Sequence, residues 1–232
     1  MKNLFYRELT QELTDIEISG EAHHHFKNVI RGKVEEAVQI FNGQGLVAQG
    51  TVSSLSKKNM IISLEQIDLK EPYENVELIL GIPKKEYLES IIRSAIQIGV
   101  SQVSLINTDF TPWKFKMYER LNKIMESALI QSENPYLPVI KEFNCLEDLL
   151  KVKKNQRILC FSTETDEDLQ LETPYHSLLV GPEGGFSLNE IELLKNSENV
   201  VLQRCNIPIM KAEVAVPFGL GHLYNQHNKK SD

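Results

Sequence analysis

The chain has 232 residues, of which 41% are hydrophobic and 25% charged, a composition typical of a soluble globular protein. Its formal net charge of −7 argues mildly against a nucleic-acid-binding protein, because phosphate contacts require lysine and arginine. No apolar run approaches the roughly 20 residues that cross a membrane, and the first residues lack the apolar core of a signal peptide. We therefore expect a cytoplasmic protein with no membrane partner.

Cysteines and local basic clusters refine this first reading. Cys145, Cys160 and Cys205 are odd in number and far apart, which indicates neither a disulfide framework nor a metal knuckle and fits a reducing cytoplasm. Basic residues nevertheless gather in four places: Arg31 with Lys33, Lys57-Lys58, Lys84-Lys85, and Lys114 with Lys116 beside Trp113. Each cluster by itself is compatible with an ordinary solvated face. Because a local basic patch can bind phosphate in a chain of negative net charge, the net charge does not exclude RNA binding.

Residues 1–71 have the pattern of a small all-β domain. An apolar segment, Ala37–Phe41, ends at Asn42-Gly43, which is a strong hairpin signal. The chain resumes as a strand over Leu46–Leu55, turns at residues 56–59 and returns over residues 60–67. Short strands at this spacing favour a small barrel or sandwich, with a short helix or turn near residues 24–31.

Residues 72–232 alternate between strand and helix patterns. The first helix carries apolar residues from Tyr87 to Ile96 and ends at Gly99. Strands are expected over residues 76–82, 103–106, 157–162, Ser177–Val180 and 199–202, and further helices over residues 118–131, Leu146–Val152 and Leu188–Lys195. The alternation predicts a parallel sheet with helices on its faces, and we place the domain boundary at Glu71-Pro72.

Three loops follow three of the expected strands and carry the residues most suited to a ligand. They span residues 162–164, 181–185 and 202–210. In an open α/β sheet, ligands bind outside the carboxyl ends of the strands. If the three strands are neighbours, the three loops converge on one pocket.

The loop at residues 181–185, Gly-Pro-Glu-Gly-Gly, interrupts an apolar strand just before a helix. Ser187 and Glu190 have the spacing of a capping box, so backbone N–H groups at a helix start would face a ligand. The loop lacks the spacing of a dinucleotide fold or a P-loop, and Glu183 would repel a polyphosphate. It suits a ligand with hydroxyls, a carboxylate and positive charge. The alternative is a tight turn that only reverses the chain.

At this point the sequence resembles the RsmE family, the 16S ribosomal RNA uridine N3-methyltransferases of the SPOUT superfamily. The strongest match is Leu-Leu-Val-Gly-Pro-Glu-Gly-Gly-Phe-Ser at residues 178–187, followed by Glu190-Ile191. Residues 24–31 and 41–45 are similar to the family's N-terminal signature, and Ile-Met-Lys-Ala-Glu-Val-Ala at residues 209–215 is similar to its Ile-Leu-Arg-x-Glu-Thr-Ala. The likeness covers most of the chain.

The resemblance implies a PUA-like, RNA-binding β-barrel over residues 1–71 and a trefoil-knotted α/β SPOUT methyltransferase domain over residues 72–232. It implies S-adenosyl-L-methionine as methyl donor, 16S rRNA of the small ribosomal subunit as substrate, and a homodimer. The loops at residues 181–185 and 202–210 would be the knot loops around the cofactor. The cofactor-binding candidates are Thr163, Val180, Gly181, Pro182, Glu183, Gly184, Gly185, Leu202, Ile209 and Met210.

Several residues depart from the family pattern, mostly near the expected site. Lys211 and Val214 replace an arginine and a threonine, which removes a fork-shaped guanidinium and a hydroxyl. The other departures are Cys205-Asn206, Pro208, Glu133-Asn134, and the residues Pro217, Gly219 and Gly221, which weaken the expected closing helix. These changes leave the fold expectation intact. They keep open a non-catalytic or altered-specificity RNA-binding SPOUT homologue.

Methylation of uridine N3 requires removal of its imino proton and alignment of N3 with the methyl–sulfur bond. Lys211 is the candidate electrostatic stabiliser and Glu213 the candidate positioning or proton-accepting group; the alternative is a surface ion pair at a helix start.

For the RNA, we expect phosphate contacts at Arg31, Lys33 and Lys84, with His25 capping or stacking. Trp113 or Phe115 either stacks on a base or packs in the core. The triplet at residues 23–25, His-His-His, has no further ligand at metal spacing, so no metal is expected.

Overall fold

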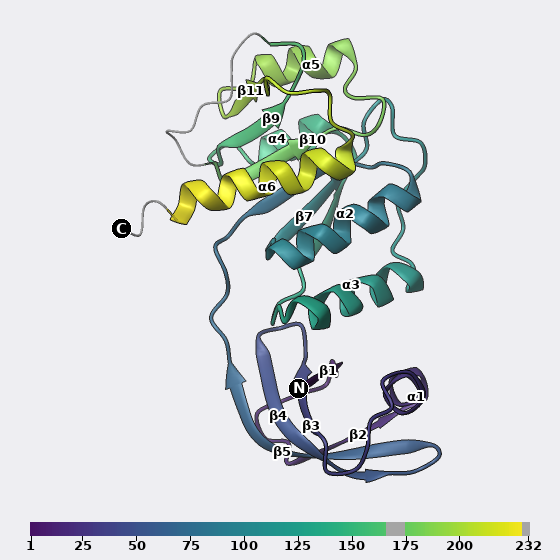
Figure 1. Ribbon diagram of the computed structural model, residues 1–232. Helices are drawn as coiled ribbons and strands as arrows, with labels where there is room; N and C mark the ends of the chain where they lie inside the picture. Colours follow the sequence, from purple (N-terminus) through teal and green to yellow (C-terminus); the bar gives the residue numbers. More distant parts are fainter. Residues whose placement is uncertain (166–174, 229–232) are drawn as a thin grey trace. The chain divides into compact units, whose positions relative to one another are not determined.

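The computed structural model describes residues 1–165 and 175–228, and its contacts divide the chain into two units (Figure 1). The first unit comprises Met1–Pro72 together with Glu126–Leu137, and the second comprises Tyr73–Met125 and Pro138–Asp232. The segment Glu126–Leu137 therefore groups with the N-terminal unit, although we expected it in the C-terminal domain.

The first unit is built on one five-stranded sheet with the order β1-β3-β4-β5-β2. All its pairs are antiparallel except β1 with β3. The strands are β1 (Lys2–Phe5), β2 (Asp15–Ser19), β3 (Ala37–Phe41), β4 (Leu46–Leu55) and β5 (Asn59–Leu69). Within the described residues no pairing joins β1 to β2, so the expected barrel is a sheet with two unpaired ends.

A short helical segment covers the core of the first unit. It consists of α1 (Gly20–His24) and a π-helical turn, η1 (His25–Val29), which together replace the short helix or turn expected near residues 24–31. Phe26 is fully buried, with Ile40, Met60 and Ile62 in the same core. The sheet thus buries one face beneath this helical segment and leaves alternate residues exposed.

The second unit contains a six-stranded sheet with the order β11-β9-β10-β6-β7-β8, in which every pair is parallel. Its strands are β6 (Glu77–Gly81), β7 (Gln102–Ile106), β8 (Val139–Phe143), β9 (Ile158–Phe161), β10 (Ser177–Val180) and β11 (Val200–Gln203). The expected parallel α/β sheet is confirmed, and β9, β10 and β11 are neighbours. Their carboxyl ends therefore meet at one edge of the sheet.

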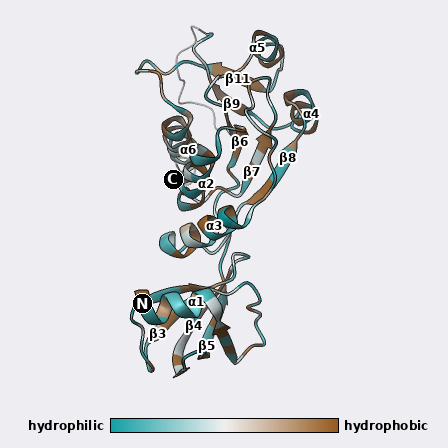
Figure 2. Ribbon diagram, turned by 90° about the vertical axis from the view of Figure 1, so that its right-hand side faces the viewer, coloured by the Kyte–Doolittle hydropathy of each residue, from teal (hydrophilic) through white to brown (hydrophobic). Residues whose placement is uncertain are grey.

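Helices cover both faces of this sheet (Figure 2). On one face lie α2 (Lys85–Ile98) and α6 (Ala212–Asn228), which pack against each other. On the other face α4 (Leu146–Val152) and α5 (Leu188–Lys195) share a core with residues of β6, β9, β10 and β11. The boundary between the two units falls within the helix α3 (Glu119–Ser132), between Met125 and Glu126. Among the described residues, no helix is long and apolar enough to cross a membrane.

The closing helix α6 is continuous although it contains Pro217, Gly219 and Gly221. A Cβ added to Gly219 would lie 2.7 Å from a methyl carbon of Leu178 and 2.8 Å from the ring of Phe161, so the missing side chain lets α6 approach the sheet closely. We expected the glycines only to weaken this helix. At Gly219 the low helix propensity is instead offset by close packing.

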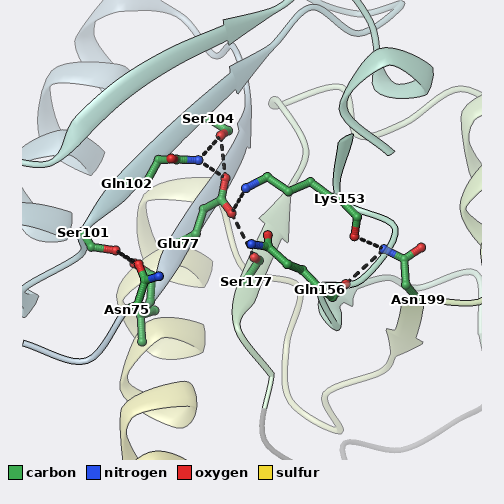
Figure 3. A network of polar contacts seen from close by, with 10 residues as sticks. Asn75, Glu77, Ser101, Gln102, Ser104, Lys153, Gln156, Ser177 and Asn199 are labelled. Atoms are coloured by element: carbon green, nitrogen blue, oxygen red, sulfur yellow. Dashed lines mark hydrogen bonds and ion pairs between the residues drawn. The ribbon is translucent and has the colours of Figure 1, made fainter. Parts of the chain in front are cut away.

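A buried polar network lies at the opposite edge of the sheet from the three loops (Figure 3). The Glu77 carboxylate at the start of β6 accepts hydrogen bonds from Gln102 Nε2 at 2.6 Å, Ser104 Oγ at 2.5 Å and Ser177 Oγ at 3.1 Å. It also pairs with Lys153 Nζ at 2.6 Å, and both side chains of this ion pair are buried. This single carboxylate therefore connects β6 with β7, β10 and the end of α4.

Candidate functional site

The structure brings the three loops at the carboxyl ends of β9, β10 and β11 together around one cavity of about 590 Å³. A volume of this size is within the range of small-molecule and cofactor sites. The wall combines apolar side chains with polar ones, and it is formed by residues 161–164, Val180, 182–186, Ile191, Arg204, Cys205, 207–210, Ala212 and Ala215. The expected convergence of the loops on one pocket is confirmed.

The glycine loop between β10 and α5 depends on close backbone approaches. A Cβ on Gly81, at the end of β6, would lie 2.5 Å from Pro182 Cδ and 2.9 Å from its backbone nitrogen. A Cβ on Gly184 would lie 3.0 Å from Phe110 Cβ, whereas Gly185 has open space but a positive φ of 72°. Steric contact requires glycine at Gly81, and backbone conformation favours it at Gly185.

Two glutamates fix this loop through backbone N–H groups. Glu183 Oε1 accepts a hydrogen bond from Lys84 N at 3.0 Å, at the start of α2. Glu190 completes the expected capping box with Ser187, and its other oxygen accepts from Asp109 N at 3.1 Å. The capping box is confirmed. The carboxylate of Glu183 has a structural partner in α2, so it ties the cavity wall to that helix.

Most of the cofactor-binding candidates line the cavity, namely Thr163, Val180, Pro182, Glu183, Gly184, Gly185, Ile209 and Met210. Two do not. The side chain of Leu202 is 7% exposed and packs in the core shared with α4 and α5, and Gly181 lies behind Phe186, whose ring would be 3.2 Å from an added Cβ. Leu202 and Gly181 are the first residues of their loops and do not belong to the cavity wall.

Sequence reasoning did not single out several wall residues, among them Phe161, Phe186 and Arg204. Arg204 lies within the loop at residues 202–210, so its charge could have marked it as a partner for an anionic group. Phe161 belongs to β9, whose apolar sequence predicts core packing, and its place on the cavity wall depends on the tertiary structure. Cys205 also lines the wall, and partial burial raises the pKa of its thiol.

The residues of the wall fit S-adenosyl-L-methionine in chemical type. An adenine ring and a methionine chain need apolar contacts, which Phe161, Val180 and Ile209 offer. A carboxylate needs a cation such as Arg204, and an ammonium needs an acid such as Glu164. Backbone N–H groups of the glycine loop suit hydroxyl or carboxylate oxygens.

The catalytic candidates lie where the loop at residues 202–210 leads into α6. The Lys211 carbonyl accepts hydrogen bonds from Val214 N and Ala215 N, so Lys211 directly precedes α6 and its carbonyl bonds to the first turn of that helix. Lys211 is exposed and Glu213 half-buried, and neither belongs to the cavity wall, which includes Ala212 and Ala215 between and beside them. Within the described residues they form no ion pair with each other, so the alternative reading as a surface ion pair is not supported.

The RNA-binding candidates belong to both units. His25, Arg31 and Lys33 are exposed on the first unit, where Arg31 has a φ of 57° and Lys33 N donates to Glu36 Oε2 at 2.9 Å. Lys84 is exposed on the second unit at the start of α2.

Trp113 and Phe115 are held by packing. Trp113 Nε1 donates to Pro83 O at 2.8 Å, its ring centroid is 5.9 Å from that of Phe115, and Phe115 is 8% exposed. These contacts favour the packing interpretation for both rings. Among the described residues, no group of three or more His, Cys, Asp or Glu side chains is arranged to hold a metal ion.

Comparisons with known proteins agree with this geometry. The curated Ribosomal RNA small subunit methyltransferase E of Rickettsia conorii is 29% identical over 215 residues, which cover 88% of this chain and 87% of that protein. Two solved structures have TM-scores of 0.81 to this fold. One is the small subunit methyltransferase E of Neisseria gonorrhoeae bound to S-adenosyl methionine, at 17% identity with 97% of each chain covered. The other is a methyltransferase of Legionella pneumophila in complex with SAM, at 20% identity with 96% of each chain covered.

Two family models match the chain itself. The model of an RNA methyltransferase PUA domain matches residues 18–65, and the model of an RNA methyltransferase domain matches residues 70–223. The first lies within the N-terminal unit and includes α1 and η1, and the second contains the parallel sheet with its cavity. The chain therefore belongs to this family of RNA methyltransferases, and its resemblance to RsmE is confirmed.

Proposed function

We propose that the protein methylates N3 of a specific uridine in 16S rRNA of the small ribosomal subunit, with S-adenosyl-L-methionine as methyl donor. The observation that carries the proposal is the cavity enclosed by three loops at the carboxyl ends of β9, β10 and β11, in a chain of this family. The curated relatives that carry the name Ribosomal RNA small subunit methyltransferase E support 16S rRNA as the substrate.

The cofactor would be held by the wall residues of the three loops. Apolar side chains such as Val180 and Ile209 would enclose its adenine ring, and Arg204 would pair with its carboxylate. When bound, the cofactor supplies an activated methyl group on a sulfonium. The glycine loop, fixed through Glu183 and Glu190, keeps its backbone N–H groups in place before the ligand arrives, which lowers the ordering cost of binding.

Transfer to N3 requires a group that accepts the imino proton and a cation that stabilises the negative charge left on the base. We assign the first role to Glu213 and the second to Lys211. Both residues lie at the start of α6, beside Ala212 and Ala215 of the cavity wall, and Lys211 is exposed to an incoming base. The RNA would be held by phosphate contacts to Arg31, Lys33 and Lys84, with His25 capping or stacking on it.

We also propose that the protein acts in the cytoplasm as a homodimer and that its loops at residues 181–185 and 202–210 form the trefoil knot of the SPOUT fold. Exposed apolar side chains support the dimer. Val214 (50% exposed) and Phe218 (43%) lie four residues apart, on the same face of α6, and Ile209 (88%) lies in the loop that leads into this helix. Monomeric proteins seldom leave such a group in water. Sedimentation of the protein with Ile209→Ser and Phe218→Ser tests this, since a dimer that uses this surface should dissociate.

Isothermal calorimetry with S-adenosyl-L-methionine tests the cofactor. We expect saturable binding, and an absence of heat at high cofactor concentration would overturn the proposal. Mass spectrometry of 16S rRNA tests the reaction, because 3-methyluridine should vanish from a strain that lacks the gene. Its persistence would favour a non-catalytic RNA-binding homologue, and methylation of purified tRNA instead of ribosomal subunits would favour another RNA substrate.

The assignment of Lys211 has its own test. Lys211→Arg restores the residue of the family motif and should raise kcat if lysine performs the same role less well. Lys211→Ala should lower kcat while the calorimetric affinity for the cofactor stays unchanged. Unchanged kcat in both variants would overturn the assignment.

A further inference from the structure

We infer that residues 110–118, between β7 and α3, together with Lys84 form a docking surface for the phosphate backbone of the RNA substrate. This inference rests on the proposed function, and it adds Lys114 and Lys116 to the residues that bind the RNA. The sequence of the segment is Phe-Thr-Pro-Trp-Lys-Phe-Lys-Met-Tyr, which contains two lysines and no acidic residue.

The segment begins against the wall of the cofactor cavity. Phe110 packs on Gly184, because a Cβ added there would lie 3.0 Å from Phe110 Cβ, and Gly184 is a wall residue. Just before it, Asp109 accepts a hydrogen bond from Ser187 Oγ at 2.5 Å, and its N–H donates to Glu190. Lys114 is four residues beyond Phe110, so its Cα lies at most about 14 Å from that of Phe110. An RNA strand whose base enters the cavity would therefore pass this segment.

Aromatic contacts hold the segment in a defined conformation. Trp113 donates to the Pro83 carbonyl, and Lys85 Nζ lies 4.9 Å from the Trp113 ring centroid and 5.6 Å from that of Tyr118. Tyr118 OH in turn donates to Glu89 Oε1 at 3.2 Å. Because Trp113, Phe115 and Tyr118 pack inward, the alternating Lys114 and Lys116 side chains remain exposed.

The charges near this surface favour an anionic partner. Lys84, Lys114 and Lys116 are exposed and form no ion pair within the part of the chain that the structure describes. Most of the neighbouring acids have a partner of their own: Glu183 accepts from Lys84 N, Asp109 accepts from Ser187, Glu89 binds Tyr118 and Arg120, and the exposed Glu119 pairs with Lys123. Glu86, in the first turn of α2, is the exposed exception. In a chain with 32 acidic and 25 basic residues, three exposed lysine side chains that form no ion pair in the described part of the chain match a polyanion.

The test is the salt dependence of RNA binding by the variant Lys114→Gln/Lys116→Gln. The probe is a transcript of 16S rRNA, without cofactor. Each phosphate contact to single-stranded RNA contributes about 0.7 to the slope of log K against log salt. Two lost contacts should lower the slope by about 1.4. The ratio between the RNA affinity of the unchanged protein and that of the variant should therefore be about sevenfold smaller at about 200 mM salt than at about 50 mM.

Matched variants make the result specific. Lys141→Gln/Lys154→Gln removes two exposed lysines elsewhere on the same unit and should leave the slope unchanged. Lys114→Arg/Lys116→Arg keeps the charges and should keep the slope. The inference is overturned if the Lys114→Gln/Lys116→Gln variant binds with the original slope, or if the arginine variant loses it. If the slope falls as expected but the unchanged protein methylates no RNA, the proposed function fails and the docking surface stands.

Discussion

Two glycines of α6 that look alike in sequence should respond to alanine with opposite signs. Gly219 is buried against the sheet, and its added Cβ would meet Leu178 at 2.7 Å and Phe161 at 2.8 Å. Gly221 is exposed, and nothing lies within 4 Å of its added Cβ. Gly221→Ala should therefore raise the free energy of unfolding, whereas Gly219→Ala should lower it.

The magnitudes follow from helix propensity and packing. Alanine is favoured over glycine in a helix interior by about 1 kcal/mol, and Gly221→Ala should show most of that gain. Gly219→Ala has the same gain, but contacts under 3 Å force a shift against Leu178, which is fully buried. Overpacking of this kind costs about 1–3 kcal/mol. The free energies of unfolding of the two variants should therefore differ by about 1–3 kcal/mol, because the gain in helix propensity is common to both and only Gly219→Ala has the overpacking cost.

Equilibrium unfolding in urea measures this difference directly, provided that both variants have the same m-value. Because Phe161 also lines the cavity, Gly219→Ala should in addition weaken cofactor binding in calorimetry, and Gly221→Ala should not. Equal stabilisation by both substitutions would refute the claim that α6 packs on β9 and β10 through a glycine contact.

Three further predictions concern single contacts. Lys153→Met leaves the buried Glu77 carboxylate without its cation and should cost about 3–5 kcal/mol in urea unfolding, whereas Lys151→Met, at an exposed pair, should cost less than about 1 kcal/mol. Similar costs would contradict the buried network. Glu183→Ala should weaken cofactor affinity about fivefold, the equivalent of about 1 kcal/mol for a lost cap, while Glu183→Gln keeps an acceptor for Lys84 N. If Gln is as damaging as Ala, the carboxylate acts on the ligand instead. Burial and then Glu89 raise the pKa of Tyr118 to about 12, so its stabilising contribution is complete below pH 10 and is lost as pH rises through about 12. An ultraviolet titration minus that of Tyr118→Phe should show this ionisation, and a midpoint near 10 would exclude it.

Elements with a strong local signal were predicted to within a few residues from sequence. The bounds of β3, β4, α4, β10 and α5 agree with the expected ones. Three strands were missed, and two of them lack a local signal. β1 has four residues and pairs in parallel with the distant β3, and β8 is a largely exposed edge strand stabilised by β7. The third, β2, does carry a signal, because Ile16 and Ile18 alternate with exposed residues.

The sequence predicted the part of the site that depends on sheet topology, which is the convergence of the three loops. Parallel strands place their carboxyl ends at one edge, so three loops after three adjacent strands meet whatever their detailed sequences are. The contacts that fix those loops depend on tertiary distances. The bond from Lys84 N to Glu183 joins residues 99 positions apart, and it exists because Gly81 lets β6 approach Pro182. No local sequence pattern indicates that β6 and Pro182 lie so close together.

Four of the departures from the family motif, in the loop at residues 202–210 and at the start of α6, fall on residues that do not hold the fold together. Asn206, Pro208, Lys211 and Val214 are all exposed. Two other departures, Asn134 and Gly219, are buried. Exposed substitutions usually change stability by less than about 0.5 kcal/mol. The loop at residues 202–210 and the start of α6 can therefore change in sequence while the cavity persists. Variants of Lys211 and Val214 should therefore retain the stability of the unchanged protein, and a kinetic comparison of these variants measures their effect on the reaction separately from the fold.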